Sequence, residues 1–89
     1  MSQTLVKPID LGGGIQNAEV RFYADDGRPG GLYYEHPCKD GKLSPGWIPF
    51  EGPQAWQLLK LEPLTLSPSL LCRSCGHHGF VREGRWVSA

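Results

Sequence analysis

The chain has 89 residues, the size of one small domain, and its 9 Lys and Arg residues balance 9 Asp and Glu residues. This zero net charge argues against a general binder of nucleic acid or of anionic membranes, because both need a basic surface. The sequence has no run of about 18 apolar residues and no basic start followed by an apolar stretch, so we expect neither a membrane span nor a secretory signal. The cytoplasm is therefore the expected location.

Glycine and proline determine the expected fold class. The 12 glycines and 8 prolines are spread along most of the chain, which interrupts long helices and favours short strands joined by turns. Residues 1–17 are expected to be a flexible leading segment, because Gly12-Gly13-Gly14 forms a joint that resists fixation in one conformation. Residues 18–89 are expected to form a single, mostly β domain of short antiparallel strands.

Three strands are predicted in the first half of this domain. Around Val20 and Phe22, apolar and charged side chains alternate, which indicates a strand with one buried face. Aromatic residues indicate the second strand, and Pro49 assigns the third to a sheet edge, because proline cannot donate to a ladder. The expected strands are residues 18–23, 32–36 and 47–50, joined by loops at residues 25–31 and 37–46.

The second half is predicted to contain one more strand, a crossing segment and a hairpin. Pro68 excludes a regular central strand around it, so an ordered crossing segment is expected there. Glu83-Gly84 predicts a tight hairpin turn, with Phe80 and Trp86 on one face of the hairpin. The expected strands are residues 55–61, 79–82 and 85–88, and the crossing segment is residues 64–71. One or two helical turns are the alternative for residues 55–61, where prolines on both sides favour the strand.

The segment Cys72-Arg73-Ser74-Cys75-Gly76 carries the strongest chemical signal. Two thiols three positions apart bind one metal ion when the chain turns between them, and this C-x-x-C-G pattern is typical of a zinc knuckle. The remaining cysteine, Cys38, lies two positions after His36. A site of His36, Cys38, Cys72 and Cys75 uses every cysteine once, and it predicts a structural Zn²⁺ that staples a domain with a small core.

Alternatives remain open for this cluster. His78 competes with His36 for the histidine position, and His77 is a weaker competitor because it lies very close to Cys75. The cysteine pair would be redox-active next to a βαβ unit, but the glycines that follow it argue against a helix there. Unrelated buried thiols are the remaining alternative, and iron fits a single site containing histidine less well than zinc does.

Two segments resemble a family of small phage and prophage proteins of unknown function: the Pro-Ser segment Leu64-Thr65-Leu66-Ser67-Pro68-Ser69-Leu70-Leu71, and the hairpin Gly79-Phe80-Val81-Arg82-Glu83-Gly84-Arg85-Trp86 that follows the Cys/His knuckle. Members often have an upstream aromatic strand, for which Tyr33-Tyr34-Glu35-His36-Pro37-Cys38 is the counterpart here. The resemblance covers residues 30–88, although Leu64 stands where the family prefers proline. It implies a phage context, a host-cell cytoplasm and metal binding, but no activity.

The residues favour a non-enzymatic module that binds another protein through aromatic side chains, because aromatics dominate the energetics of protein interfaces. In a phage protein this partner is expected to be a host factor or a virion component. The competing interpretation is that most of these aromatics form the small core. The candidate contact residues are Tyr33, Tyr34, Trp47 and Trp56.

A zinc-ribbon-like nucleic-acid-binding protein is the alternative function. Arg73, Arg82 and Arg85 lie near the knuckle and the hairpin in the sequence. Phe80 and Trp86 would then stack on bases. The zero net charge argues against this function, and a solvated hairpin face accounts for the arginines better.

A zinc hydrolase is the third function considered. Catalytic zinc keeps an open coordination position and has a general base nearby, for which Glu35 and Glu83 are the candidates. Three thiolates reduce the Lewis acidity of the metal, and the sequence contains no other recognisable catalytic set. A non-enzymatic role is therefore expected.

Overall fold

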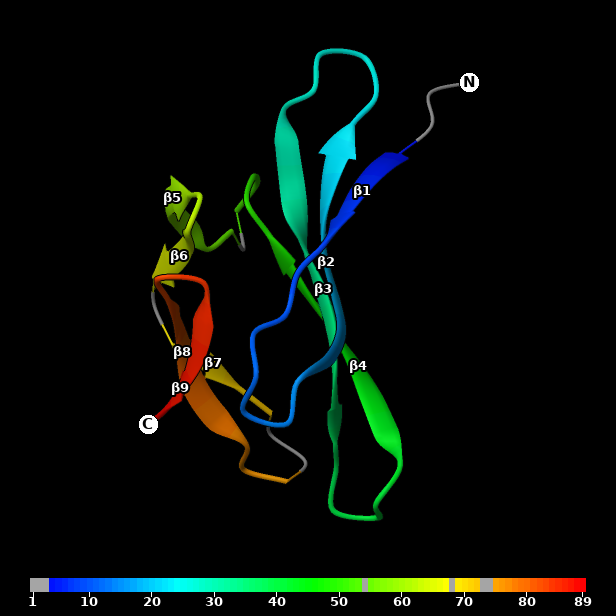
Figure 1. Cartoon of the computed structure of the whole chain (residues 1–89), viewed down its shortest axis with the longest axis vertical. Coiled ribbons are helices and arrows are strands. Elements are labelled where there is room, and N and C mark those ends of the chain that lie inside the picture. Colours follow the sequence, from blue (N-terminus) through cyan, green and yellow to red (C-terminus); the bar gives the residue numbers. More distant parts are fainter. Residues whose placement is uncertain (1–3, 54, 68, 73–74) are drawn as a thin grey trace.

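The structure is a computed structural model that describes residues 4–53, 55–67, 69–72 and 75–89. These residues contain nine strands and no helix, which confirms the mostly β fold class (Figure 1). Accordingly, no described segment is a helix that could cross a membrane. The strands are β1 (Thr4–Pro8), β2 (Gln16–Tyr23), β3 (Pro29–Pro37), β4 (Leu43–Pro49), β5 (Gln57–Leu61), β6 (Leu64–Ser67), β7 (Leu70–Leu71), β8 (His78–Arg82) and β9 (Arg85–Ser88).

Strands β1 to β4 form a four-stranded antiparallel sheet in which each strand pairs with the next. Period-two alternation turns one face of this sheet inward, so that Val20 in β2 and Leu32 in β3 are buried. Strand β4 lies at the edge and contains Pro49, as predicted, but it already begins at Leu43. The last part of the predicted loop at residues 37–46 is therefore strand, held by its register with β3.

The C-terminal half contains two small sheets, β5–β6 and β7–β8–β9. The predicted crossing segment at residues 64–71 consists of the short strands β6 and β7, and Pro68 between them lies outside the described residues. The predicted hairpin is confirmed as β8 and β9. Its turn has Glu83 at φ 50° and Gly84 at φ 76°, the left-handed conformation that a two-residue hairpin turn favours.

The core lies between the inner face of the four-stranded sheet and the C-terminal strands. Trp86 in β9 is 7% exposed and covers Gly79, where a Cβ atom would lie 2.5 Å from the indole ring. The register pairs Val81 with Trp86 and Phe80 with Val87, so the expectation that Phe80 and Trp86 share a face is wrong. The buried apolar residues are Leu11, Ile15, Ala18, Val20, Leu32, Tyr34, Ile48, Leu64, Leu66, Leu70, Val81 and Trp86.

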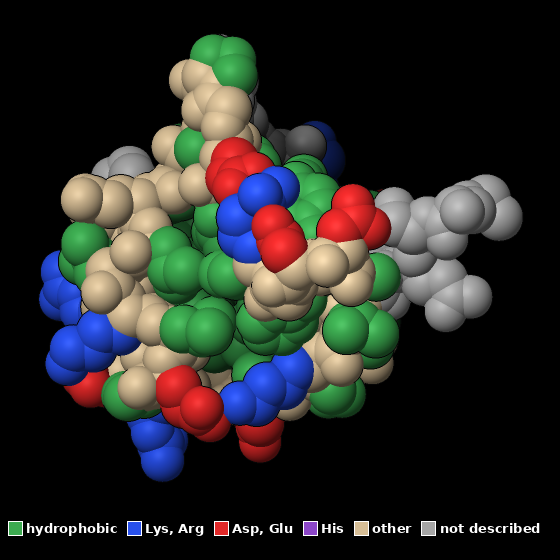
Figure 2. All heavy atoms as spheres, turned by 90° about the horizontal axis from the view of Figure 1, so that it is seen from above, with side chains coloured by type: hydrophobic (Ala, Val, Ile, Leu, Met, Phe, Trp, Pro, Cys, Tyr) green, Lys and Arg blue, Asp and Glu red, His purple; other side chains and the backbone are tan. Residues whose placement is uncertain are grey.

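One end of the molecule exposes apolar side chains. Figure 2 shows them in the middle of this face, with charged side chains around them. Between β2 and the β5–β6 turn, a hollow of about 330 Å³ is lined by residues that include Phe22 and Leu61. Beside this hollow, Lys7 in β1 and Glu62 form an ion pair with 2.7 Å between Nζ and Oε1. This contact links the two halves of the chain.

The structure differs from the flexible leading segment expected for residues 1–17. Residues 4–8 are strand β1, and Leu11 and Ile15 are buried in the core. The N–H of Trp86 donates to the carbonyl of Leu11 over 2.8 Å, and a Cβ at Gly13 would lie 2.6 Å from the Trp86 ring. The glycines thus allow the chain to approach Trp86 closely, and residues 1–3 lie outside the described part.

Candidate metal centre

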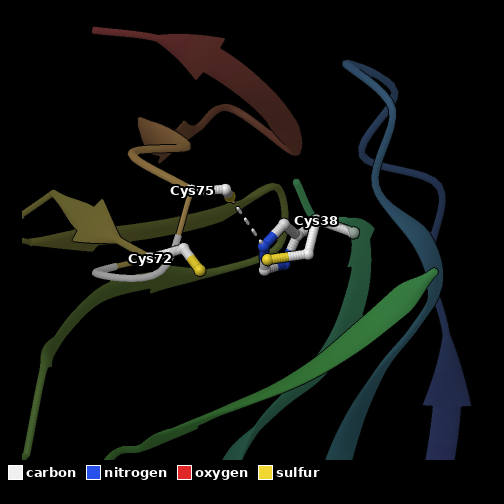
Figure 3. A group of neighbouring side chains, drawn as sticks. Cys38, Cys72 and Cys75 are labelled. Atoms are coloured by element: carbon white, nitrogen blue, oxygen red, sulfur yellow. Dashed lines mark hydrogen bonds between the residues drawn. The ribbon is translucent and has the colours of Figure 1, made fainter. Parts of the chain in front are cut away.

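Four side chains from two distant parts of the chain meet at one end of the core. His36, Cys38, Cys72 and Cys75 each offer one ligand atom, and these atoms all lie within 4.8 Å of one another. Figure 3 shows the three sulfurs directed toward a common space. The structure thus brings together the four residues predicted as ligands, and this group could hold a metal ion.

The first pair comes from the end of β3 and the loop that follows it. His36 points inward because it continues the alternation of Leu32 and Tyr34, and it is 3% exposed. The loop is fixed by two backbone hydrogen bonds, Cys38 N–H to Lys42 O at 3.0 Å and Gly41 N–H to Cys38 O at 2.9 Å. This short turn keeps the Cys38 thiol close to the His36 ring.

The second pair comes from the turn between β7 and β8. The N–H of Gly76 donates to the carbonyl of Cys72 over 2.8 Å, and the N–H of Cys72 donates to the carbonyl of His77 over 2.8 Å. Gly76 has a φ of 78°, a conformation that glycine adopts without strain. This local geometry explains why a glycine follows the second cysteine. Arg73 and Ser74 lie outside the described residues.

The neighbouring sulfurs affect the ionisation of Cys38. The backbone N–H of Lys39 lowers the pKa of Cys38, but burial and the neighbouring thiols of Cys75 and Cys72 raise it, and the net direction is upward. Gathering several thiolates is therefore unfavourable in the bare protein. A bound dication reverses this effect, because thiols that coordinate a metal ion are deprotonated.

The His36 ring also fits a metal ligand. Its Nε2 atom lies 3.6 Å from the Cys75 sulfur, whereas its buried Nδ1 atom has no hydrogen-bond partner among the described residues. Burying an imidazole costs free energy unless its polar atoms are compensated. Because Nε2 lies against the Cys75 sulfur, it is the ring nitrogen in position to bind a metal ion, and such a bond would compensate Nε2 but not Nδ1.

The two histidines that competed for the ligand position lie elsewhere. His77 stacks between His36 and Trp86, with ring-centre distances of 4.9 and 4.7 Å. Burial, and secondarily the charge of His36, lower the pKa of His77. His78 is exposed, and its Nε2 lies 2.7 Å from the hydroxyl of Ser69. Neither residue belongs to the described cluster, and no sequence signal indicated the stacking role of His77.

The predicted contact residues lie in different environments. Tyr33 and Trp47 are opposite each other on the outer face of the four-stranded sheet. Tyr34 is buried, and Trp56 is half-buried against the core with its indole N–H donating to the carbonyl of Ser69 over 3.3 Å. Among the predicted aromatic contacts, Tyr33 and Trp47 therefore remain the accessible pair.

The outer face also carries a cation above these rings. The Arg21 guanidinium lies 4.6 Å from the centre of the Tyr33 ring and 5.7 Å from that of Trp47. A hollow of about 210 Å³ opens beside them, lined by Arg21, Trp47 and three neighbours that include Tyr23 and Gly30. Arg21 was not singled out from the sequence, although its place in the alternation of β2 put it on this face.

The arginines predicted to contact nucleic acid are only partly described. Arg82 and Arg85 are exposed on the β8–β9 hairpin, and Arg73 lies outside the described residues. Arg82 covers the Phe80 ring at 4.1 Å, and Trp86 is buried. The pair of rings expected to stack on bases is therefore not exposed together.

Comparison of this chain with known protein families, curated proteins and solved structures gives no match. The resemblance to small phage and prophage proteins accordingly stays a prediction from sequence.

Proposed function

We propose that this protein is a small interaction module of phage or prophage origin, stabilised by a structural zinc ion, that binds another protein in the host-cell cytoplasm. The observation that carries the proposal is the convergence of three thiols and one buried imidazole within 4.8 Å. Thiolate and imidazole ligands suit zinc, whereas magnesium and calcium prefer oxygen. Four protein ligands also match the closed tetrahedral coordination of structural zinc sites.

A hydrolytic function has less support. Four protein ligands leave no open position for a water molecule on a tetrahedral zinc ion. Glu35 alternates with His36 along β3, faces the outer side and accepts hydrogen bonds from Tyr33 and Asn17. Glu83 lies in the hairpin turn and pairs with Lys60 at 3.2 Å. Neither carboxylate is part of the described cluster.

The outer face of the four-stranded sheet is the surface that we propose for partner binding. Trp47 is 47% exposed there, next to Tyr33 and Arg21. Aromatic and arginine side chains are the types most enriched at the energetic centres of interfaces. The nucleic-acid alternative has weaker support, since the chain has zero net charge and Trp86 is buried.

Metal content tests the zinc centre. We expect one zinc ion per chain in protein purified under reducing conditions, measured by elemental analysis and native mass spectrometry. Cys75→Ser and His36→Ala should lose the metal, whereas His78→Ala, a matched control on an exposed strand position, should retain it. A reduced chain that folds cooperatively without metal would rule out the zinc centre, and equal losses in both histidine variants would rule out this ligand set.

Capture from host extracts tests the binding surface. Trp47→Ser should lose a protein that the wild-type chain captures. Leu59→Ser is the matched control, because Leu59 is 53% exposed on β5, away from the outer face. If both variants capture the same proteins as the wild type, the outer face is not the binding surface.

A further inference from the structure

The two edges of the four-stranded sheet differ in their capacity to accept another strand. At β4, the hydrogen bond from Phe50 N–H to Gly30 O shows which residues bond to β3. Alternate residues point the other way, so the backbone N–H and carbonyl positions of residues 43, 45, 47 and 49 face outward, away from β3. Pro45 and Pro49 therefore stand at outward positions, where they offer no N–H. The carbonyl of Pro49 is in addition occupied by the N–H of Trp56 at 2.9 Å. This edge is protected against pairing.

The β1 edge has fewer prolines at positions whose backbone groups point away from the sheet. The bond from Ile9 N–H to Ala18 O at 3.0 Å fixes the β1–β2 ladder, so Leu5 and Lys7 face β2 and Val6 faces away. Both the N–H and the carbonyl of Val6 point outward. No described strand pairs with this side of β1.

The side chains of β1 are suited to an interface. Leu5 is 55% exposed and Val6 is 50% exposed, on opposite faces of the strand. The charge of Lys7 is already paired with Glu62 of the same chain at 2.7 Å. An edge strand with unpaired backbone groups and exposed apolar side chains is a template for another strand, and in β1 a proline stands only at the last outward position, Pro8.

We propose that β1 pairs with β1 of a second copy of this chain in an antiparallel, two-fold symmetric dimer. With Val6 opposite the partner's Val6, each N–H donates to the other's carbonyl. In the next outward pair, the N–H of Thr4 donates to the carbonyl of the partner's Pro8, whereas the carbonyl of Thr4 has no donor opposite it because proline lacks an N–H. The central Val6 pair is thus complementary to itself, as a two-fold interface requires, and two four-stranded sheets join into one of eight strands.

This dimer places both outer faces on the same side. A two-fold axis between antiparallel neighbours in one sheet runs perpendicular to that sheet, so it does not exchange the faces. Val6 shares its face with Arg21, its partner in the β1–β2 register. The surfaces that carry Arg21 and Trp47 would therefore be presented together, which raises the avidity for a partner with repeated sites.

The association state of the metal-loaded chain, measured by sedimentation equilibrium, tests the proposal. We expect a dimer whose dissociation constant rises at least about tenfold in Val6→Pro, because two intermolecular hydrogen bonds are lost. That N–H faces away from β2, so the substitution spares the β1–β2 ladder, and an unchanged circular dichroism spectrum checks this. Val6→Ala, the matched control, keeps the N–H and should retain the dimer.

A second variant covers the case in which Val6→Pro disturbs the fold. Val6→Lys puts two like charges next to the two-fold axis and should also yield monomers, with the loss of dimer reduced at high salt. A wild-type chain that stays monomeric up to millimolar concentration overturns the proposal. So does a dimer that both Val6→Pro and Val6→Lys retain, since it would form through another surface.

Discussion

The two halves of this chain differ in the length of their strands. Strands β2 and β3 have 8 and 9 residues and form a long ladder with two register shifts. Strands β5 to β9 have between 2 and 5 residues, and β7 is the shortest. Ladders this short stabilise themselves weakly. The C-terminal half therefore depends on its anchors, whereas the four-stranded sheet is held by its own pairing.

The anchors of the C-terminal half lie at its two ends. At the hairpin tip, the N–H of Gly84 donates to the carbonyl of Leu64 over 2.8 Å, and the N–H of Glu83 donates to the hydroxyl of Thr65 over 3.1 Å. At the other end lies the cysteine–histidine cluster. The sheet supplies His36 and Cys38 from a long strand and its loop, whereas Cys72 and Cys75 belong to a turn next to the two-residue strand β7.

Metal removal should have the largest effect of the changes considered, and it should affect the two halves differently. Zinc contributes about 10–16 kcal/mol of apparent binding energy in zinc-finger peptides, more than most small domains have in total stability. We expect a chelator to abolish the amide-exchange protection of β7–β9 in a hydrogen-exchange measurement, while the β2–β3 ladder keeps part of its protection. Equal loss in both halves would mean that they fold as one unit, and no loss would mean that the metal contributes nothing.

Two glycine-to-alanine substitutions compare the rigidity of the two halves. Each half has a glycine beneath a tryptophan, where a Cβ would lie 2.5 Å from Trp86 at Gly79 and 2.4 Å from Trp47 at Gly31. A carbonyl oxygen crowds both positions similarly, at 2.7 Å for Gly79 and 2.8 Å for Gly31, so the difference lies in the rings: Trp86 is buried and cannot move aside, whereas Trp47 is half-exposed. Gly79→Ala should therefore cost about 2–3 kcal/mol of unfolding free energy and Gly31→Ala about 1 kcal/mol.

Urea denaturation of the metal-loaded proteins measures both values. Each variant serves as the control for the other, because both add one methyl group to a β-strand glycine under an indole ring. Equal costs would show that the rigidity of the two halves does not differ at these positions.

The smallest expected effect is in the β8–β9 turn. Glu83 adopts a φ of 50°, which asparagine accepts more readily than glutamate. Glu83→Asn should raise the stability by about 0.5 kcal/mol in thermal denaturation, since the exposed ion pair with Lys60 contributes little. Glu83→Gln removes the charge without changing the backbone preference, so a gain of the same size in this control would contradict the explanation.

The sequence predicted the parts of the fold that depend on neighbouring residues. Alternation located β2, aromatic residues located β3, and Glu83-Gly84 located the final hairpin. The cluster was predictable for a different reason: a chain with three cysteines, two of them in a C-x-x-C-G pattern, has few ways to place every thiol in one site. The choice of His36 followed from its spacing to Cys38.

Other features depend on contacts between distant residues and were missed. Residues 4–15 hold their conformation through β2 and Trp86, which no local pattern in that segment reveals. The pairing of Val81 with Trp86, in contrast, was available from the sequence, because a two-residue turn fixes which residues face each other. The stacking of His77 on His36 required the two halves to be assembled first.

The column of rings formed by His36, His77 and Trp86 gives this protein an intrinsic optical probe of its metal centre. Of the described tryptophans, Trp86 alone is buried, and a single imidazole separates its indole from the His36 ring. Histidine in contact with indole quenches its fluorescence, to an extent that depends on the charge and position of the imidazole. Loading or loss of the ion at His36 would thus change the emission of Trp86, and occupancy could be followed without an added dye.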